Sequence, residues 1–372
     1  MKKVALVYDR INKWGGAEKV LLAFHELFPE APLYTSVYDL DKALWARVFP
    51  KVYTTFLNKI SFLRAKHELL APLMPMAFEG LDFSEYDLVI SVTSESAKGI
   101  ITKPSTIHIC YCLTPTRYLW SHYDTYFSRQ SSRIILKPLI DYLKSWDEIS
   151  ALRPDVMVAI STAVKARIKK YYGKDSIIIH PPVEVEKFKV SRISKVPQIL
   201  RKFKDGYYLI VSRLVPYKKV DLAIEAFSDL GLPLVVVGTG SEERKYKFKY
   251  RSKKNILFAG FINEGELPVY YQRAKAFIYP QEEDFGITAV EAQAAGIPVI
   301  AYKKGGVLDT VIEGKTGIFF SSQTKESLID AVYRFNDLKP WNKNYCFRNA
   351  QKFSLARFKK DFMKLVEKYV NG

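Results

Sequence analysis

Short apolar runs alternate with longer amphipathic stretches along this chain, and that alternation predicts a parallel α/β architecture. In the first half, buried strands are predicted at Val4–Tyr8, Leu88–Ser91, Ile107–Tyr111 and Val156–Ile160. In the second half, they are predicted at Tyr207–Val211, Leu234–Val237, Ile256–Ala259, Ala276–Ile278 and Pro298–Ala301. Strands that are apolar along their whole length are typical of sheets covered on both faces.

Apolar residues at helical spacing fill the intervals between these runs. The segment Glu18–Phe28 is apolar on one face, and Pro29 ends it. Similar helices are predicted at Ala163–Tyr172, Asp221–Leu230, Glu266–Ala274 and Ile287–Ala295. Two successive sets of alternating strands and helices predict two doubly wound, Rossmann-like α/β domains. Because parallel sheets bind ligands at the carboxyl ends of their strands, we expect the two domains to face a shared cleft.

A break between the two sets follows His180, where two prolines precede the polar stretch Glu184–Gln198. We therefore predict an N-terminal domain over residues 1–182 and a C-terminal domain over residues 183–352. A basic helix with an apolar stripe is predicted over residues 353–372. Its stripe fits a surface of either domain, including a return onto the N-terminal one.

Composition narrows the class of protein. The chain has 372 residues, of which 48% are hydrophobic and 26% charged, as in ordinary globular proteins. This excludes a disordered chain, and no apolar stretch approaches the ~18 residues of a spanning helix. The apolar run after Met1-Lys2-Lys3 is too short for a signal peptide. The expected location is the cytoplasm, with peripheral contact to the inner face of the membrane as an option.

Positive charge is concentrated in the second half of the chain. The net charge is +18, and residues 187–372 hold 33 Lys/Arg against 19 Asp/Glu. Such a field favours anionic partners. Residues 244–254 combine seven cations with aromatics, which fits a solvated face best, then a membrane-surface patch, then a nucleic-acid site. Residues 57–76 fit either an amphipathic surface contact or, better, a core-packed helix ended by Pro72 and Pro75.

Metal-ligand spacing is missing from the sequence. Cys110 and Cys112 are separated by one residue rather than two, and Cys346 is distant. The five histidines, His25, His67, His108, His122 and His180, are widely spaced. We therefore expect no bound metal and no cofactor.

Four loops that follow predicted strands have residues suited to binding an anion or a sugar. Gly15 and Gly16 precede a helix and form either an anion cradle or a tight turn. Arg213 and Lys218 follow another strand and suit two phosphate groups, although a solvated basic loop is the alternative. Gly238 allows a ribose or base to lie against the backbone.

The fourth loop is the most informative. Glu283 precedes a helix that starts near Ile287, and Gly286 permits close approach of a ligand to the helix N-terminus. Acidic residues before a helix also complement its dipole, which explains Glu283 without a ligand. Glu291 lies in the second turn, where a buried carboxylate requires a hydrogen-bond partner such as a pair of ligand hydroxyls.

These residues resemble a retaining glycosyltransferase of family 4, which has the GT-B fold. The stretch from Glu283 to Glu291 resembles the family's two-glutamate signature, Arg213 with Lys218 its diphosphate clamp, and Gly15-Gly16 its N-terminal glycine loop. Other matching motifs are Ile160-Ser161, Tyr171-Tyr172-Gly173, Pro181-Pro182-Val183, Gly305-Gly306-Val307 and Gly314-Lys315-Thr316-Gly317. The resemblance covers roughly residues 3–350.

The resemblance implies a nucleotide-sugar donor and no metal, because Arg213 and Lys218 would neutralise the leaving diphosphate in its place. It implies Glu283, Arg213 and Lys218 as catalytic residues. The implied donor-binding residues are Gly15, Gly16, Gly238, Phe285, Gly286, Ile287, Thr288 and Glu291. Glu291 would bind the ribose, and Gly16 would approach the diphosphate across the cleft. Retention of anomeric configuration asks for positioning and charge stabilisation more than for a dedicated nucleophile.

A closer resemblance concerns the N-terminal domain. Tyr111–Trp120 and Ser145-Trp146-Asp147 resemble segments of bacterial polysaccharide mannosyltransferases, although Leu113 stands where that subgroup commonly has histidine. This implies transfer of mannose from GDP-mannose to a glycan or lipid-linked glycan. Trp14, Arg117 and Tyr118 are the candidate acceptor residues.

Two alternatives stay open. One is a retaining transferase that uses a UDP-sugar. The other is a non-catalytic protein that binds RNA or a lipid surface through its positive charge, although no nucleic-acid partner is expected.

Overall fold

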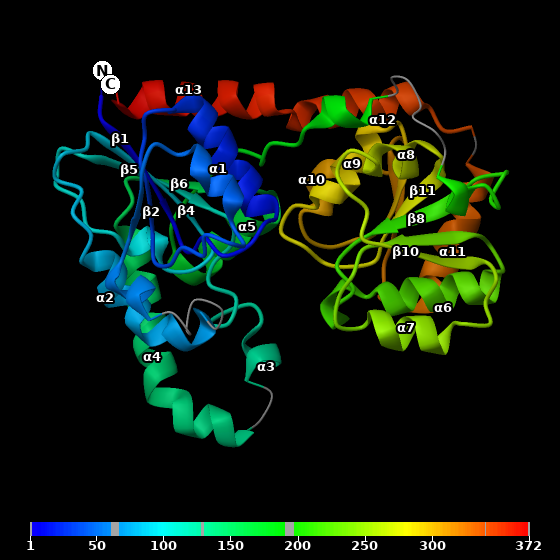
Figure 1. The fold of residues 1–372 in the computed structure, drawn as a ribbon, viewed down its shortest axis with the longest axis horizontal. Helices are drawn as coiled ribbons and strands as arrows, with labels where there is room; N and C mark the ends of the chain where they lie inside the picture. The colour runs from blue at the N-terminus through cyan, green and yellow to red at the C-terminus, as the bar shows by residue number, and fades with distance from the viewer. Residues whose placement is uncertain (1, 61–66, 128–129, 190–196, 339, 371–372) are drawn as a thin grey trace. The chain divides into compact units, whose positions relative to one another are not determined.

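A computed structural model describes residues 2–60, 67–127, 130–189, 197–338 and 340–370 (Figure 1). They form two compact units. Unit 1 consists of Met1–Pro181 together with Phe358–Gly372, and unit 2 consists of Pro182–Arg357. The predicted C-terminal segment 353–372 is therefore divided, with its first five residues in unit 2.

Unit 1 is built on a seven-stranded sheet in which every pair of neighbours is parallel. The strand order is β3-β2-β1-β4-β5-β6-β7. The strands are β1 (Val4–Tyr8), β2 (Leu33–Thr35), β3 (Val52–Thr54), β4 (Leu88–Thr93), β5 (Ile107–Cys112), β6 (Val156–Ala159) and β7 (Ile177–Ile178). The chain reverses its direction of progress across the sheet between β1 and β4, so the loops after these two strands meet at one edge.

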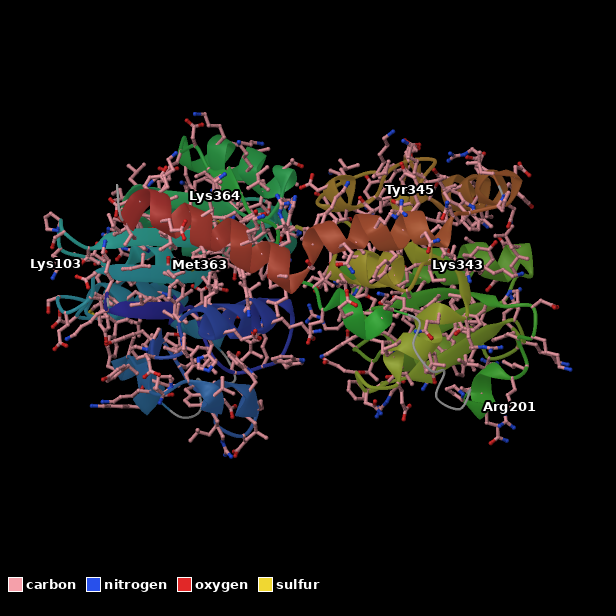
Figure 2. The ribbon with its side chains drawn as sticks, turned by 90° about the horizontal axis from the view of Figure 1, so that it is seen from above. Lys103, Arg201, Lys343, Tyr345, Met363 and Lys364 are labelled. Carbon is pink, nitrogen blue, oxygen red and sulfur yellow. The ribbon has the colours of Figure 1, made fainter. Side chains whose placement is uncertain are left out.

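Unit 1 contains six α-helices among its described residues. They are α1 (Gly16–Leu27), α2 (Met74–Glu79), α3 (Tyr123–Tyr126), α4 (Gln130–Leu152), α5 (Thr162–Tyr172) and α13 (Leu355–Val370). The rings of Phe358 and Phe362 on α13 lie 5.3 and 4.6 Å from that of Phe24 on α1. This aromatic cluster anchors the end of the chain in unit 1. Figure 2 shows α13 from above, with Met363 and Lys364 labelled.

The predicted helix over residues 57–76 is wrong. Short 3-10 turns replace it, η2 (Phe56–Lys59) and η4 (His67–Leu73), while residues 61–66 lie outside the described part. Pro75 occupies the first turn of α2 and so begins a helix instead of ending one, because a proline at that position loses no hydrogen bond. Leu70 and Met74 are buried, as expected for core packing.

Unit 2 has a six-stranded parallel sheet of order β10-β9-β8-β11-β12-β13. The strands are β8 (Tyr207–Val211), β9 (Leu234–Val237), β10 (Ile256–Gly260), β11 (Ala274–Tyr279), β12 (Val299–Tyr302) and β13 (Gly317–Phe320). The reversal here falls between β8 and β11. The two units therefore repeat one doubly wound topology.

The helices of unit 2 cover this sheet. They are α6 (Val220–Leu230), α7 (Glu243–Lys249), α8 (Leu267–Gln272), α9 (Ile287–Ala294), α10 (Val307–Thr310), α11 (Lys325–Asp337) and α12 (Lys343–Ala350). The helix predicted to reach Ala274 ends at Gln272, because Ala274 already pairs with Tyr207 in the sheet. Tyr208 and Phe227 are among the residues that fill the core between the sheet and α6.

The basic segment 244–254 lies on α7 and the turn after it. Lys245 pairs with Glu242, the N-cap residue of α7, Lys247 pairs with Glu243 on the helix, and Lys249 pairs with Glu225 of α6. These exposed pairs fit the solvated-face interpretation. Among the described residues, no helix is both long and apolar enough to cross a membrane.

Candidate functional site

The loops after β8 and β11 hold the three predicted catalytic residues. Because these strands are neighbours and parallel, their carboxyl ends meet at the point where the chain reverses across the sheet. Arg213 and Lys218 lie on the first loop and Glu283 on the second. The fold of unit 2 thus brings together side chains that are 65 or more residues apart in sequence.

Lys218 and Glu283 form an ion pair at this edge. The other carboxylate oxygen of Glu283 accepts a hydrogen bond of 3.1 Å from the Tyr279 hydroxyl. The Lys218 side chain is only 11% exposed, and that of Glu283 is 24% exposed. Partial burial strengthens the interaction between the charges and holds the ammonium in a defined position.

The turn that positions Lys218 is unusual. Lys218 is the last residue of the 3-10 turn η8 (Pro216–Lys218), and the next residue, Lys219, has a φ of 53°. This is the left-handed region, which non-glycine residues rarely adopt. Lys219 also precedes the first residue of α6, so the tight reversal connects Lys218 directly to a core helix.

Arg213 is exposed at the same edge. Its guanidinium donates to the Tyr217 hydroxyl and lies 5.9 Å from the centre of that ring. The Lys218 ammonium lies 5.3 Å from the same ring. Tyr217 therefore contacts both predicted phosphate-binding cations: its hydroxyl accepts from Arg213, and its ring lies near the Lys218 ammonium.

Glycines bring backbone close to Glu283. A Cβ on Gly305, whose φ is 82°, would lie 2.4 Å from the Glu283 carbonyl oxygen. The N–H of Gly306 donates to that carbonyl at 2.8 Å. Gly286 begins α9 with a φ of 96°, and a Cβ there would lie 2.9 Å from the Tyr279 hydroxyl. Side chains at these positions would displace the carboxylate or its partner.

The first turn of α9 contains the remaining predicted donor residues. Ile287 and Thr288 are half-buried at the helix start, where backbone N–H groups lack partners within the helix. Phe285 is buried, and its ring packs 5.6 Å from that of Phe353. Only the backbone of Phe285 is therefore suited to a ligand.

Glu291 is 5% exposed on α9. The Tyr271 hydroxyl donates to its carboxylate at 3.0 Å. Burial, followed by the Glu291 charge, raises the pKa of Tyr271 well above its ordinary value, so the hydroxyl stays protonated as a donor. A protein group thus supplies the hydrogen-bond partner that the sequence argument required. The predicted role of Glu291 in ribose binding stays a prediction.

Gly238 has a structural reason to be glycine. Its φ is 124°, and a Cβ would lie 1.9 Å from the carbonyl oxygen of Ser212. The loops after β8 and β9 cross here with no space for a side chain. Its N–H donates to the Gly260 carbonyl at 2.7 Å.

The other predicted residues belong to unit 1. Gly15 caps α1 and Gly16 begins it, and the buried Glu18 of that helix accepts a 2.7 Å hydrogen bond from Tyr8. Trp14 is 45% exposed. Arg117 and Tyr118, both half-buried, lie on the loop after β5.

A buried ion pair anchors that loop, and sequence reasoning missed its role. Lys98 and Asp147 lie 2.5 Å apart, with each side chain 2% exposed. Asp147 also accepts from Thr116 and Trp120 of the loop and from Tyr172 of α5, each at 2.7 Å. The network therefore holds the loop segment that contains Arg117 and Tyr118.

A second group missed from the sequence lies at the reversal point of unit 1. The Asp9 carboxylate accepts hydrogen bonds from four consecutive backbone N–H groups, those of residues 94–97, and from the Thr93 hydroxyl, at 2.7–3.1 Å. Arg10 pairs with Glu95 at 2.5 Å. The available signal was the position of Asp9 and Arg10 immediately after a buried strand.

Among the described residues, no group of three or more His, Cys, Asp or Glu side chains is arranged to hold a metal ion. The three cysteines are buried and unbonded to one another. Burial raises the pKa of the Cys110 thiol to about 11 and that of Cys346 to about 12, so neither supplies a thiolate near neutral pH.

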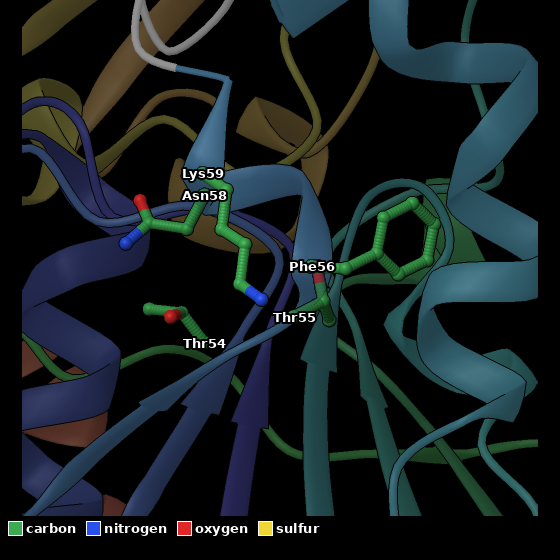
Figure 3. A pocket seen from close by; sticks show the side chains of 5 residues that line it. All are labelled: Thr54, Thr55, Phe56, Asn58 and Lys59. Carbon is green, nitrogen blue, oxygen red and sulfur yellow. The ribbon is translucent and has the colours of Figure 1, made fainter.

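A cavity of about 420 Å³ lies at the carboxyl end of β3 in unit 1 (Figure 3). Two of its lining side chains have structural roles. Thr55 caps η2 and donates to the Ser36 carbonyl at 2.9 Å, and Asn58 accepts from the Tyr38 N–H at 3.0 Å. Because β3 is the edge strand, this cavity is separated by β2 from the reversal point of the sheet.

Comparisons with known proteins agree with the geometry of unit 2. The family model for "Glycosyl transferases group 1" matches residues 192–352. A GDP-mannose-dependent alpha-(1-6)-phosphatidylinositol monomannoside mannosyltransferase of Mycobacterium tuberculosis is 28% identical over 199 residues, which are 48% of this chain and 51% of that protein. The chain thus spans about half the length of the curated relatives it matches.

Solved structures resemble the whole chain. Sucrose-phosphate synthase from Thermosynechococcus elongatus superposes with a TM-score of 0.77 at 15% identity, covering 99% of both chains. HepE from Anabaena in complex with UDP gives 0.71 at 18% identity, covering 98% of this chain and 100% of that one. These likenesses confirm the GT-B fold, and the family match over residues 192–352 supports the resemblance stated from the motifs of that segment.

Proposed function

We propose that this chain is a retaining glycosyltransferase that moves mannose from GDP-mannose to a glycan or lipid-linked glycan. One observation carries the proposal: the Lys218–Glu283 pair lies at the reversal point of a sheet within the segment that matches group 1 glycosyl transferases. A lysine and a carboxylate there suit the two parts of a nucleotide sugar, the diphosphate and the sugar hydroxyls.

The proposed chemistry is a displacement on one face of the sugar. The bond from the anomeric carbon to the diphosphate oxygen breaks, and its electron pair leaves with the nucleotide. The acceptor hydroxyl oxygen bonds to the same face, and its proton passes to a leaving phosphate oxygen. Lys218 and Arg213 stabilise the negative charge that develops on the diphosphate, while Glu283 orients the sugar.

The pairing of Lys218 with Glu283 has a consequence for binding. A diphosphate competes with the Glu283 carboxylate for the Lys218 ammonium. When it does so, Glu283 keeps the Tyr279 hydrogen bond and becomes available to sugar hydroxyls. Donor binding and alignment of the sugar are then coupled through one ion pair.

Binding of the donor is tested by thermal unfolding with GDP-mannose, GDP, UDP-glucose or UDP in the presence of EDTA. A ligand at 100 times its Kd stabilises the protein by about 2.7 kcal/mol. We expect GDP-mannose and GDP to raise the unfolding temperature of the wild-type chain. Lys218→Ala should reduce that rise and should lower mannose transfer at least tenfold. Lys325→Ala is the matched control, since that lysine forms an exposed pair with Asp229 in the same unit. Wild-type transfer by Lys218→Ala contradicts the proposal.

A UDP-sugar donor is the second candidate. The structure of HepE that resembles this chain contains UDP, which favours a uridine nucleotide. The mannosyltransferase of M. tuberculosis is named for GDP-mannose and shares more sequence identity with this chain. A stabilising shift with UDP compounds alone would retain the enzyme class and replace the donor.

The acceptor is proposed from the same relative, whose name specifies a glycolipid. A lipid-linked acceptor would place this enzyme at the inner face of a membrane. Transfer of labelled mannose to a lipid extract, compared with transfer to free mannose oligosaccharides, distinguishes the two acceptor types.

A further inference from the structure

A smaller cavity, of about 270 Å³, lies in unit 1, and Trp14 is the one predicted site residue among its lining residues. It is lined by Trp14, Asp41, Lys42, Leu44 and Trp45. Ligand pockets for drug-sized molecules begin at about 300 Å³, so this cavity suits a single ring with its substituents. Its lining combines two indole rings with one carboxylate and one ammonium.

The two segments that form the cavity are fixed to each other. Residues 11–14 follow β1, and residues 37–45 follow β2. The N–H of Ile11 donates to the Val37 carbonyl, and the N–H of Asp39 donates to the Ile11 carbonyl, both at 2.8 Å. Backbone pairing of this kind makes a preformed site, which reduces the entropy cost of binding.

The indole rings are also held in place. The Trp45 ring nitrogen donates to the Lys13 carbonyl at 2.8 Å. Its ring lies 6.3 Å from that of the buried Phe49 and 6.1 Å from that of Trp14, tilted by 52° from the latter. Trp45 thus supports Trp14, which remains 45% exposed. A rigid aromatic surface binds at low conformational cost.

The polar rim is equally ordered. Asp39 accepts hydrogen bonds from the N–H groups of Asp41 and Lys42, each at 3.3 Å, and its carboxylate pairs with the Lys42 ammonium at 3.0 Å. Asp41 and Lys42 both line the cavity, so they add a carboxylate acceptor and an ammonium donor to its two indole rings.

We propose that this cavity binds one pyranose ring of a glycan acceptor, a subsite that rests on the proposed function. A pyranose has apolar C–H faces and a rim of hydroxyls. The faces suit the indoles, and the hydroxyls suit Asp41 and Lys42. Trp14 immediately precedes Gly15-Gly16, so the subsite lies at the end of the loop between β1 and α1. Nucleic acid fits less well, because the Asp41 carboxylate opposes phosphate.

The test is a fluorescence titration of the full chain with α-1,6-linked mannotriose, which reports directly on Trp14 and Trp45. We expect saturable quenching. Trp14→Ala raises the Kd at least tenfold, and Asp41→Asn raises it several-fold. Phe248→Ala is the control, since Phe248 is an exposed aromatic residue, at 70%, in unit 2. Absence of saturation, or equal Kd values for Trp14→Ala and wild type, overturns the proposal.

Two further measurements separate the glycan subsite from the proposed donor site and from a membrane contact. Lys218→Ala must bind mannotriose like wild type. If the wild-type chain shows no nucleotide-dependent shift but still binds mannotriose through Trp14, the proposed donor site is rejected and the subsite is kept. Leu40, Leu44 and Val48 near the cavity are at least half exposed. Trp14-dependent binding to phosphatidylglycerol vesicles without mannotriose binding would make this surface a membrane contact and overturn the glycan proposal.

Discussion

In each sheet the strand order reverses between two neighbouring strands, β1 and β4 in unit 1 and β8 and β11 in unit 2. The two reversal points share this topology but differ in the hydrogen bonds that their loops make. Each has a cation–carboxylate pair, Arg10–Glu95 in unit 1 and Lys218–Glu283 in unit 2. In unit 1 the loop after β4 folds around the Asp9 carboxylate, which engages its consecutive N–H groups. In unit 2 the carboxylate of Glu283 is bound by an ammonium and a hydroxyl instead.

This difference separates a loop with a structural role in unit 1 from the loops proposed to bind the donor in unit 2. In unit 1, the Asp9 carboxylate after β1 accepts hydrogen bonds from the backbone N–H groups of the loop after β4. Those N–H groups therefore stabilise the protein. Unit 2 has Ser212 and Arg213 after its first strand, and the neighbouring loop leads through Gly286 into α9. A helix start and two cations suit a phosphate group. The sheet topology therefore sets where the loop N–H groups meet. The side chain that follows the first strand decides whether a protein carboxylate occupies them.

The largest expected effect is from Asp9→Ala. It would leave several buried N–H groups without an acceptor, so we expect the free energy of unfolding to fall by about 3–5 kcal/mol. Hydrogen exchange followed by mass spectrometry resolves the two units, and the loss of protection should be confined to unit 1. A stability equal to wild type would contradict the assigned role of Asp9.

Gly238→Ala tests the backbone contacts of unit 2. Strain at positive φ and the overlap with the Ser212 carbonyl should together cost about 2–4 kcal/mol. Gly260→Ala is the matched control, because Gly260 has a φ of 71° and no atom lies within 4 Å of the place a Cβ would take, so only about 1 kcal/mol is expected. Equal losses in denaturant titrations would show that strain alone matters.

His108 gives unit 1 a distinctive pH dependence. Burial lowers its pKa from 6.5 to about 3, and its ring bonds to Ser91 at 2.8 Å. Because the unfolded chain binds a proton that the folded unit excludes, stability is lost as pH falls from 6.5 towards 3, by up to about 1.4 kcal/mol per pH unit. His108→Gln should flatten that slope in denaturant titrations. An unchanged slope would exclude His108 as its source.

Glu283→Gln should have the smallest effect on stability. The glutamine carbonyl can still accept hydrogen bonds from the Lys218 ammonium and the Tyr279 hydroxyl, so we expect a change in unfolding free energy of about 1 kcal/mol. Mannose transfer should nevertheless fall at least tenfold. Full activity would remove Glu283 from the site, and a loss of stability as large as that of Asp9→Ala would erase the contrast between the two reversal points.

Much of the fold was predictable from local pattern. The bounds of β1, β8 and β9 agree with their predicted ranges, because a buried parallel strand is a continuous apolar run. The strands β2, β3 and β13 were missed. β2 and β3 have three residues each, which give too little pattern to distinguish a strand from a loop, and β13 begins with Gly317, a residue type that strands disfavour.

The sequence by itself determined the longer strands, most of the helices and the loops that hold Arg213, Lys218 and Glu283, because these depend on neighbours within a few residues. Tertiary structure alone decided that Lys218 contacts Glu283 and that Asp9 binds a loop more than 80 residues away. Those contacts follow from strand order: β8 lies beside β11 and β1 beside β4. The order is set by packing of the whole sheet, which no short stretch of residues encodes.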